Sequence, residues 1–594
     1  MTVAPTPSNG PWSAYEPAPG PSISHFWPPV VWMVIRLIDR SNLVSVIQAI
    51  IESGYVDPET TPRPRVLSIR TFLVGLLLVC LEGRPAFHTE IYDALFLRID
   101  DPQLLAELEI SKAMRQSSRQ PRMLRRLERT LQAMSRPLDI DPYPAGRRIE
   151  RTTLAQVLME DNVDRSPQAI AERREALCVL INYIVQAAVL WVDDSLAESL
   201  RSGILKHYDG SIVIDGMYVE THAAPVPVNG KWLSTEPQAG WARRDNKVIG
   251  FRHEIHNLRF AQPDPLGPNE VPPLIGAISP LCTPGTEIGE NGFRIIKALS
   301  DAGFRKNLVI GDRAYHPGSD PEVFQGPIRM ELGYHGFVSD YRKDQLGEQG
   351  DRVEGLKLVD GFYYCPEMFD SLVTAERDFR RDEGDPLKID KATRDNLMSQ
   401  RTQWAARPKA QWKPGDPVER LMCPAAGDNP TIICAHKPLS SSKGVNLNSV
   451  PNPPAFQAPC CRQESVSIPV ALNVKYRARF PFESKERETW YAHWRNAVEG
   501  GHRRWKSLLG ASVGNPDSAW AWGTAAQSIL MAFQTLAENI RIIDSFVIDV
   551  AEGRAGPKVP IPRGRPPKRR AKAPDLTLIV GEDADDSDDA EEAA

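Results

Sequence analysis

Two short apolar runs that each end in an aspartate place the strongest constraint on how this chain can fold. Residues 212–214 (Ile-Val-Ile) precede Asp215, and residues 308–311 (Leu-Val-Ile-Gly) precede Asp312. Runs of this length that are rich in β-branched residues predict buried strands. A carboxylate at the end of a buried strand is costly unless a cation pairs with it. The two aspartates therefore predict either local ion pairs or a site that binds metal.

The residues between the two aspartates predict a strand, strand, strand, helix, strand order. Polarity alternates over 247–260, which predicts a half-buried strand, and 272–280 predicts a third strand. Residues 287–304 predict a helix with Gly303 as its C-terminal stop. If the strands at 212–214 and 308–311 are neighbours, their two carboxylates repel each other and favour a divalent cation.

Such a pair of carboxylates suits Mg²⁺ or Mn²⁺, because these ions prefer hard oxygen ligands. Two such ions can activate an attacking oxygen and stabilise a leaving oxygen in phosphoryl transfer. This arrangement needs a further carboxylate. On a helix over 488–510, Arg495, Glu499 and Lys506 would share one face. That face suits a site that holds both metal and phosphate, and a surface ion-pair ladder is the alternative.

Two details of the third-acid segment remain open from sequence alone. Asp340 closes the apolar run 336–340 and is the alternative third acid if Glu499 only forms an ion pair. The Gly500-Gly501 pair costs a helix about 1 kcal/mol per glycine relative to alanine. It therefore indicates a kink, a break in the helix, or a close approach of the backbone to another element.

In this order, the three motifs resemble those of bacterial insertion-sequence transposases of the DDE type, which have a ribonuclease-H-like catalytic core. The matching residues are Asp215 in IVIDG, Asp312 in LVIGDRAY and Glu499 in RNAVEGGHRRWK. The resemblance covers about 200–320 and 480–545 well, and the N-terminal region loosely.

The third-acid helix of the family often has the pattern Tyr-x2-Arg-x3-Glu-x6-Lys. Arg495, Glu499 and Lys506 fit this pattern, whereas Tyr491 lies one residue earlier than the pattern expects. The resemblance implies that Arg495, Lys506 and the nearby Arg503 hold DNA phosphates close to the metals.

The resemblance also implies an activity. Asp215, Asp312 and Glu499 would be the catalytic residues and would bind two Mg²⁺ (or Mn²⁺) ions. Water would cut a phosphodiester at the end of a mobile element, and the freed 3′-hydroxyl would attack target DNA. The implied partners are double-stranded DNA, as terminal inverted repeats and as target, and a second copy in a homodimer. The alternatives are a catalytically inactive, transposase-derived DNA-binding protein, and a ribonuclease-H-like nuclease without strand transfer.

Positive charge is unevenly placed along the chain. The whole chain has a net charge of −5, but residues 571–594 hold nine acidic residues and one basic residue, so the rest carries +3. Within 110–130, cations recur every three or four residues and favour contact with DNA phosphates, with a solvated helix face as the alternative. These cations are Lys112, Arg115, Arg119, Arg122, Arg126 and Arg129. Pro121 indicates two short helices here rather than one.

A second basic segment lies near the C-terminus. Arg563-Gly564-Arg565-Pro566 matches the AT-hook pattern, in which extended backbone and two arginines occupy a narrow A·T minor groove. A generic basic linker is the alternative. The acidic tail that follows could compete with DNA for these arginines.

The 186 residues between Asp312 and Glu499 are too many for a plain connection and predict an inserted subdomain. This stretch contains Cys365 and His436 together with four candidate ligands of a structural Zn²⁺. These candidates are Cys423, Cys434, Cys460 and Cys461. The usual Cys-x2-Cys pairs are missing, so buried free cysteines are the alternative.

The predicted fold class is α/β: a ribonuclease-H-like mixed sheet with flanking helices, a helical N-terminal region and an inserted subdomain. The predicted parts are a disordered arm (1–27), a helical DNA-binding and assembly domain (28–200), the first part of the catalytic core (201–345), the inserted subdomain (346–480), the second part of the core (481–550), and a disordered basic and acidic tail (551–594).

The N-terminal residues lack the basic start and the apolar core of a signal peptide. The apolar run 71–81 is too short to span a bilayer. The sequence therefore predicts a cytoplasmic, nucleoid-associated protein with mostly reduced cysteines.

Overall fold

The computed structural model describes most of the chain between residues 24 and 556. The described ranges are 24–53, 67–140, 166–221, 223, 225–228, 231–244, 247–442, 447–450, 457–506, 521 and 523–556. The AT-hook-like segment, with Arg563 and Arg565, and the acidic tail lie outside these ranges, as does most of the predicted N-terminal arm.

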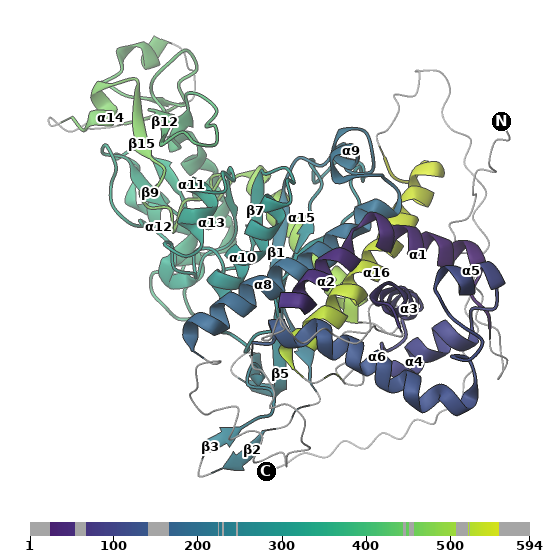
Figure 1. Ribbon diagram of the computed structural model, residues 1–594. Coiled ribbons are helices and arrows are strands. Elements are labelled where there is room, and N and C mark those ends of the chain that lie inside the picture. The colour runs from purple at the N-terminus through teal and green to yellow at the C-terminus, as the bar shows by residue number, and fades with distance from the viewer. Residues whose placement is uncertain are drawn as a thin grey trace, which may run out of the picture. The chain divides into compact units, whose positions relative to one another are not determined.

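A mixed six-stranded sheet lies at the centre of the fold (Figure 1). Its strands are β1 (Ile212–Glu220), β4 (Gly240–Arg244), β5 (Lys247–Phe260), β6 (Ile275–Ile278), β7 (Leu308–Gly311) and β8 (Gly336–Val338). The order is β4-β5-β1-β7-β8, with β6 also paired to β5. Strand β5 runs antiparallel to both β4 and β1, whereas β7 and β8 continue the sheet in parallel from β1. The chain is therefore an α/β protein, as the sequence predicts.

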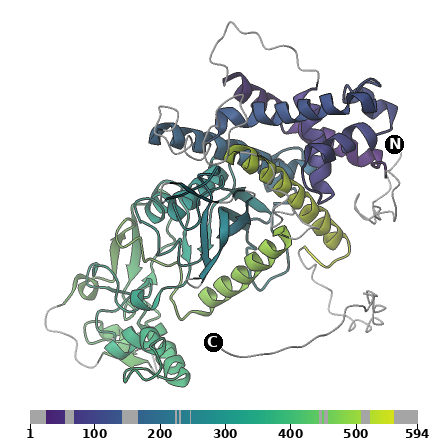
Figure 2. The same ribbon diagram turned by 90° about the horizontal axis from the view of Figure 1, so that it is seen from below.

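The two faces of this sheet pack against different helices. Helix α10 (Ile288–Asp301) packs on β5 and β6, and its buried Ile295, Ile296 and Leu299 belong to the main core. Helix α15 (Lys485–Lys506) packs on β1, β7 and β8. Below α15, Val213, Ile310 and Val498 belong to a separate apolar cluster. Figure 2 shows α15, in light green, along the teal strands.

Strand β5 differs from the sequence prediction in its burial. The prediction of a half-buried strand is wrong for residues 253–260, where every residue is buried on both faces. The reason is that β5 lies between β1 and β4 with helices on both sides, so its polar residues face packed elements instead of water. The predicted bounds of the strand are confirmed.

Helices dominate the N-terminal region, as the sequence predicts. They are α1 (Pro28–Arg40), α2 (Leu43–Ser53), α3 (Ile69–Leu81), α4 (His88–Tyr92), α5 (Pro102–Glu107), α6 (Gln120–Ser135), α8 (Pro167–Gln186) and α9 (Leu196–Arg201), with a π-helical turn at Asp93–Leu97 and 3₁₀ turns at Ser117–Arg119, Arg136–Leu138 and Ala187–Trp191. Helix α3 is buried along almost its whole length. The Ser166 hydroxyl caps α8 by accepting a hydrogen bond from the Ala169 N–H.

The C-terminal helix α16 (Thr524–Ala551) belongs to this helical region by its contacts, although it follows α15 in sequence. It packs on α8, α3 and α6, and Figure 2 shows it, in yellow, beside the purple and blue helices. Asn539 of α16 also bonds both the N–H and the C=O of Ile275 in β6. This helix therefore joins the N-terminal region to the edge of the sheet.

The inserted region has its own short elements and its own apolar clusters. Its strands and helices are β9 (Lys357–Val359), β10 (Phe362–Tyr364), α12 (Asp370–Phe379), α13 (Lys391–Arg401), β11 (Arg407–Pro408), β12 (Val418–Met422), β13 (Ile432–Ile433), β14 (Asn448–Ser449), α14 (Pro459–Arg462) and β15 (Ser465–Pro469), with 3₁₀ turns at Thr402–Trp404 and Pro438–Ser442. Three small elements elsewhere are β2 (Val226–Val228), β3 (Lys231–Leu233) and α11 (Gln325–Met330), and a 3₁₀ turn at Lys343–Gln345 leads into the inserted region.

One segment of the helical region is long and apolar enough to cross a membrane by length and composition alone. It is Pro167–Trp191, and 61% of its most apolar 18-residue window is buried inside the protein. That burial is what a core helix shows. All eight cysteines of the chain are free and buried.

Candidate active site

Asp215 and Asp312 lie side by side on neighbouring strands. Strands β1 and β7 pair in parallel, and Ile214 is the partner of Gly311 in this register. The next residue along each segment is therefore one of the two aspartates. Asp312 directly follows β7, as the sequence predicts, whereas Asp215 lies inside β1, which continues to Glu220, so the prediction that the first strand ends at Asp215 is wrong. The negative charge of Asp312 is close enough to raise the pKa of Asp215. The predicted juxtaposition of the two carboxylates is thus present.

Helix α15 brings Arg495 and Glu499 to the same place. The Arg495 guanidinium donates a hydrogen bond from Nη1 to Asp215 Oδ2 at 2.6 Å. Its other terminal nitrogen, Nη2, lies 3.4 Å from Glu499 Oε1. One guanidinium therefore contacts both carboxylates. Glu499 itself is mostly exposed, with 62% of its side-chain surface accessible, so it is free to turn toward a ligand.

Burial sets the ionisation of Asp215. This residue is 7% exposed, and loss of hydration raises the pKa of its carboxyl to about 6, against the opposing effect of the ion pair with Arg495. The nearby charge of Asp312 raises the pKa further. The group is therefore ionised at neutral pH but loses its charge in mild acid.

Asn257 and His502 complete the surroundings of Asp215. Asn257 is the register partner of Asp215 on β5, and its amide donates to the Asp215 carbonyl at 3.1 Å. The same amide contacts His502 Nε2 at 2.9 Å, and His502 Nδ1 lies 3.6 Å from Asp215 Oδ2. Burial, together with the cations around it, lowers the pKa of His502 to about 3. This imidazole is therefore neutral at pH 7 and positions Asp215 without neutralising it.

The close packing of α15 on the sheet depends on Gly501. The helix runs without interruption through Gly500 and Gly501. A Cβ atom at Gly501 would lie 2.7 Å from the Cζ of Arg259, which is buried on β5. At Gly500 nothing lies within 4 Å. Of the three possibilities left open by the sequence, the structure therefore has the close backbone approach, at the second glycine only.

A third carboxylate, Glu254 on β5, lies near the two aspartates. Burial raises the pKa of Glu254, and the charges of Asp215 and Asp312 raise it further, although a hydrogen bond from the Gly285 N–H opposes them. A Cβ at Gly216 would lie 2.7 Å from Glu254 Oε1, so a larger residue after Asp215 would displace the Glu254 carboxylate from its present position. The Asp-Gly sequence at the end of the apolar run thus has a packing reason.

The donor chemistry of the site fits Mg²⁺ or Mn²⁺, because two carboxylates are neighbours and the charge of Asp312 raises the pKa of Asp215. Asp215, Asp312 and Glu499 are the residues that would hold such an ion. In the described ranges, no three His, Cys, Asp or Glu side chains already stand together as a formed metal site. Arg495 is the cation that pairs with Asp215.

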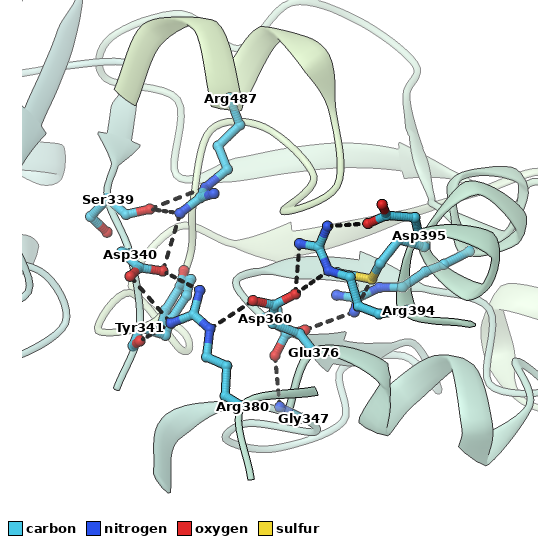
Figure 3. Close-up of polar contacts among 12 residues, drawn as sticks. Ser339, Asp340, Tyr341, Gly347, Asp360, Glu376, Arg380, Arg394, Asp395 and Arg487 are labelled. Carbon is cyan, nitrogen blue, oxygen red and sulfur yellow. Dashed lines mark hydrogen bonds and ion pairs between the residues drawn. The ribbon is translucent and has the colours of Figure 1, made fainter. Parts of the chain in front are cut away.

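The alternative third acid, Asp340, has a different role. It follows β8 and accepts hydrogen bonds from Arg380 at 3.0 Å and from Arg487 at 3.4 Å (Figure 3). Burial opposes its ionisation, but these two arginines hold the pKa of Asp340 below its usual value. Its carboxylate is therefore engaged in an ion-pair network between the inserted region and the start of α15, in which Figure 3 also shows Glu376.

Basic side chains follow Glu499 along the last turns of α15. Arg503 and Lys506 are exposed. Partial loss of hydration lowers the pKa of Lys506, as do the nearby charges of Arg252 and Arg244 from β5 and β4, whereas the charge of Glu220 opposes them. A cluster of cations that already repel one another can accept an anion such as a phosphate.

The cations predicted on one helical face of the N-terminal region are divided between elements. Helix α6 begins at Gln120 with Pro121 in its first turn, and Ser117–Arg119 form a separate 3₁₀ turn. Lys112 and Arg115 precede both, and Arg115 donates to the Phe96 carbonyl. The residues that α6 carries are Arg122, Arg126 and Arg129, opposite the buried Leu127, Leu131 and Met134. One continuous face of six cations is therefore not formed.

Comparison with protein-family models, curated proteins and solved structures gave no match. The interpretation of the site thus rests on its own residues. Sequence reasoning missed Asn257, His502, Arg259 and Glu254. Of these, only His502 carried a local signal, because it lies three residues after Glu499 and so near the same helical face.

Proposed function

We propose that this protein is a DDE-type transposase with a ribonuclease-H-like catalytic core, which cuts DNA at the ends of a mobile element and joins the freed 3′ end to target DNA. The observation that carries the proposal is the convergence of Asp215 and Asp312, on adjacent parallel strands, with Arg495 and Glu499 from a helix that comes from far along the chain.

The order of the sheet supports the same proposal. An antiparallel group, β4-β5-β1, is extended by the parallel strands β7 and β8, and the two aspartates fall on the central pair β1 and β7. Ligand sites in open sheets with parallel strands form at the carboxyl ends of those strands. The position of Asp312, directly after β7, follows this rule.

Each residue has a distinct role in the proposed reaction. Asp215, Asp312 and Glu499 would hold two Mg²⁺ or Mn²⁺ ions, which supply charge neutralisation and activation of water when bound. Arg495 keeps Asp215 ionised and in place until that binding, and its planar fork then suits a DNA phosphate. Lys506 and Arg503 extend the positive surface along the DNA backbone. His502 and Asn257 hold Asp215 from the other side.

The remaining parts of the proposal concern DNA and assembly. The partners would be double-stranded DNA, as terminal inverted repeats and as target, and a second copy of the chain that holds the other end. The arginines of α6 and the AT-hook-like segment would raise general DNA affinity. The protein would act in the cytoplasm, on the nucleoid.

A strand-transfer assay tests the proposal. Labelled linear DNA carrying element ends is incubated with a supercoiled target and Mg²⁺, and cut and joined products are separated. Asp215→Asn should abolish both products while DNA binding survives, because the amide cannot supply the charge of the carboxylate. Asp301→Asn is the matched control, since Asp301 is exposed on α10 and pairs with Lys297 at the surface.

The same assay separates the alternatives. A wild-type protein that binds ends and cuts nothing would be an inactive DNA-binding protein. Cutting without a joined product would indicate a nuclease. Mg²⁺-dependent cleavage by Asp215→Asn would remove this residue from the site and refute the proposed mechanism.

A further inference from the structure

Five of the eight cysteines surround one small cavity in the inserted region. The cavity has about 10 Å³ of free space, roughly the room that one water molecule or one ion needs. Cysteine side chains come to it from four separate segments of the chain. The residues with thiol or imidazole groups in its wall are Cys365, Cys423, Cys434, His436, Cys460 and Cys461.

Three of these cysteines lie in turns of the same construction. In each turn the N–H of the residue three positions later donates to the carbonyl of the cysteine: Met368 to Cys365 at 3.1 Å, Ala426 to Cys423 at 2.9 Å, and Lys437 to Cys434 at 2.8 Å. In each turn the N–H two positions later also bonds the cysteine sulfur; these donors are Glu367, Ala425 and His436. Burial raises the pKa of all three thiols, and these N–H donors oppose that rise. A bound metal would displace the thiol protons.

Cys461 is better placed than Cys460 to supply a fourth sulfur. Cys461 is the third residue of the short helix α14, its sulfur accepts from the Ala458 N–H, and it lies close enough to Cys365, Cys423 and Cys434 for a charge on it to act on all three. The Cys460 sulfur lies against Gly355, where a Cβ would be 3.3 Å from it. Cys460 and Cys461 are hydrogen-bonded to each other.

We propose that Cys365, Cys423, Cys434 and Cys461 bind one structural Zn²⁺ ion in a tetrahedral site, and that Cys460 lies outside the ligand set. Four thiolates are a common closed ligand set for structural zinc. In the described part of the chain the thiols surround the cavity without yet standing as a formed metal site. Binding would release their protons to solvent and draw the sulfurs together.

The short elements of the inserted region indicate that this ion would have a structural role. Its elements near the cavity are very short: β13 has two residues and α14 has four. Short elements of this kind make few backbone hydrogen bonds of their own, so a metal that links them would add to the stability of the folded region. Four ligands from four segments would link turns that follow β10, β12 and β13 to α14. The site is independent of the proposed DNA chemistry, so an Asp215→Asn variant should retain it.

Metal analysis of the full-length protein tests the site. The protein, purified without chelator, should contain one zinc per chain. Replacement by Co²⁺ should give the strong sulfur-to-cobalt charge-transfer and visible bands of a tetrahedral thiolate site. Cys461→Ser should weaken these bands, whereas Cys460→Ser, its neighbour in sequence, should leave them unchanged.

A second measurement does not depend on the folding of variants. Wild-type protein is treated with a thiol-alkylating reagent before and after chelation, and the labelled cysteines are identified by peptide mass spectrometry. Chelation should expose Cys365, Cys423, Cys434 and Cys461 together, while Cys178 in the helical core stays protected. Protein that neither contains nor takes up zinc or Co²⁺, or a ligand set that includes Cys460 in place of Cys461, would overturn the proposal.

Discussion

Two adjacent glycines of α15 should respond in opposite ways to the same substitution. Gly501→Ala places a Cβ 2.7, 2.9 and 3.0 Å from the Cζ, Nε and Nη1 atoms of Arg259. Arg259 is 3% exposed, so it has little room to move away. Overpacking of this kind costs about 1–3 kcal/mol, and the better helix propensity of alanine offsets about 1 kcal/mol of it. The net result should be a loss of about 0–2 kcal/mol.

Gly500→Ala is the matched control. A Cβ at Gly500 meets nothing within 4 Å, so this variant should gain about 1 kcal/mol from helix propensity alone. The difference between the two variants removes the propensity term and measures the overpacking cost, about 1–3 kcal/mol. Hydrogen exchange of the α15 amides should therefore be faster in Gly501→Ala than in Gly500→Ala.

The same pair of variants connects stability with function. Relief of the contact with Arg259 would move α15 away from the sheet, and with it the Arg495–Asp215 contact. DNA cleavage should therefore fall in Gly501→Ala and persist in Gly500→Ala. A second substitution, Arg259→Leu, should remove most of the difference in stability, because the two sites share one contact. Equal stabilisation by both alanines would refute the close approach of α15 to β5.

Three further outcomes are expected. With chelator present, the pKa of Asp215 is about 6 in the folded protein and 3.8 in the unfolded chain. The folded protein therefore binds this proton more tightly, and the resulting contribution to stability is complete below pH 4 and is lost as pH rises to about 6. The unfolding free energy should fall by up to about 3 kcal/mol over this range, and urea titrations of Asp215→Asn should lack that part of the decline. Lys506→Ala should weaken DNA binding in all sequences and flatten the dependence of affinity on salt, as measured by fluorescence anisotropy; an unchanged slope would place Lys506 away from DNA. Arg401 contacts Asp360 at 2.7 Å with neither side chain exposed, so Arg401→Met should cost about 3–5 kcal/mol in thermal or urea unfolding, and the Arg401→Met, Asp360→Asn double variant should recover part of it.

The parts of the site that the sequence predicts are those with a local pattern. Short runs of apolar residues precede Asp215 and Asp312, and α10 between them has helical spacing with a glycine after its end, so the element types follow from the chain itself. Glu499 is one turn from Arg495 on any helix, and their contact at 3.4 Å follows from that spacing. The order of these elements along the chain then leaves few ways to join them.

The parts that the sequence does not predict depend on contacts between distant residues. Asn257 meets Asp215 because of the register between β5 and β1, which a single sequence does not give. Helix α16 has an apolar pattern that suits any core, so its place among the N-terminal helices is set by packing that only the folded chain reveals. Cys365 lies 58 residues before Cys423, and no motif spacing marks the two as neighbours.

The long insertion between β8 and α15 is compatible with a precise site because ion pairs fix the chain where it leaves the sheet and where it returns. Arg487, in the first turns of α15, donates to the Ser339 carbonyl at 2.7 Å and contacts Asp340, both directly after β8. Glu483, two residues before α15, contacts Arg401 of the inserted region at 3.5 Å in a fully buried setting. The start of α15 is thus held by the sheet and by the insertion together. Since the rise along a helix is fixed, holding its start also sets where Arg495 and Glu499 reach Asp215, so the position of the third acid depends on residues that lie far from the proposed chemistry.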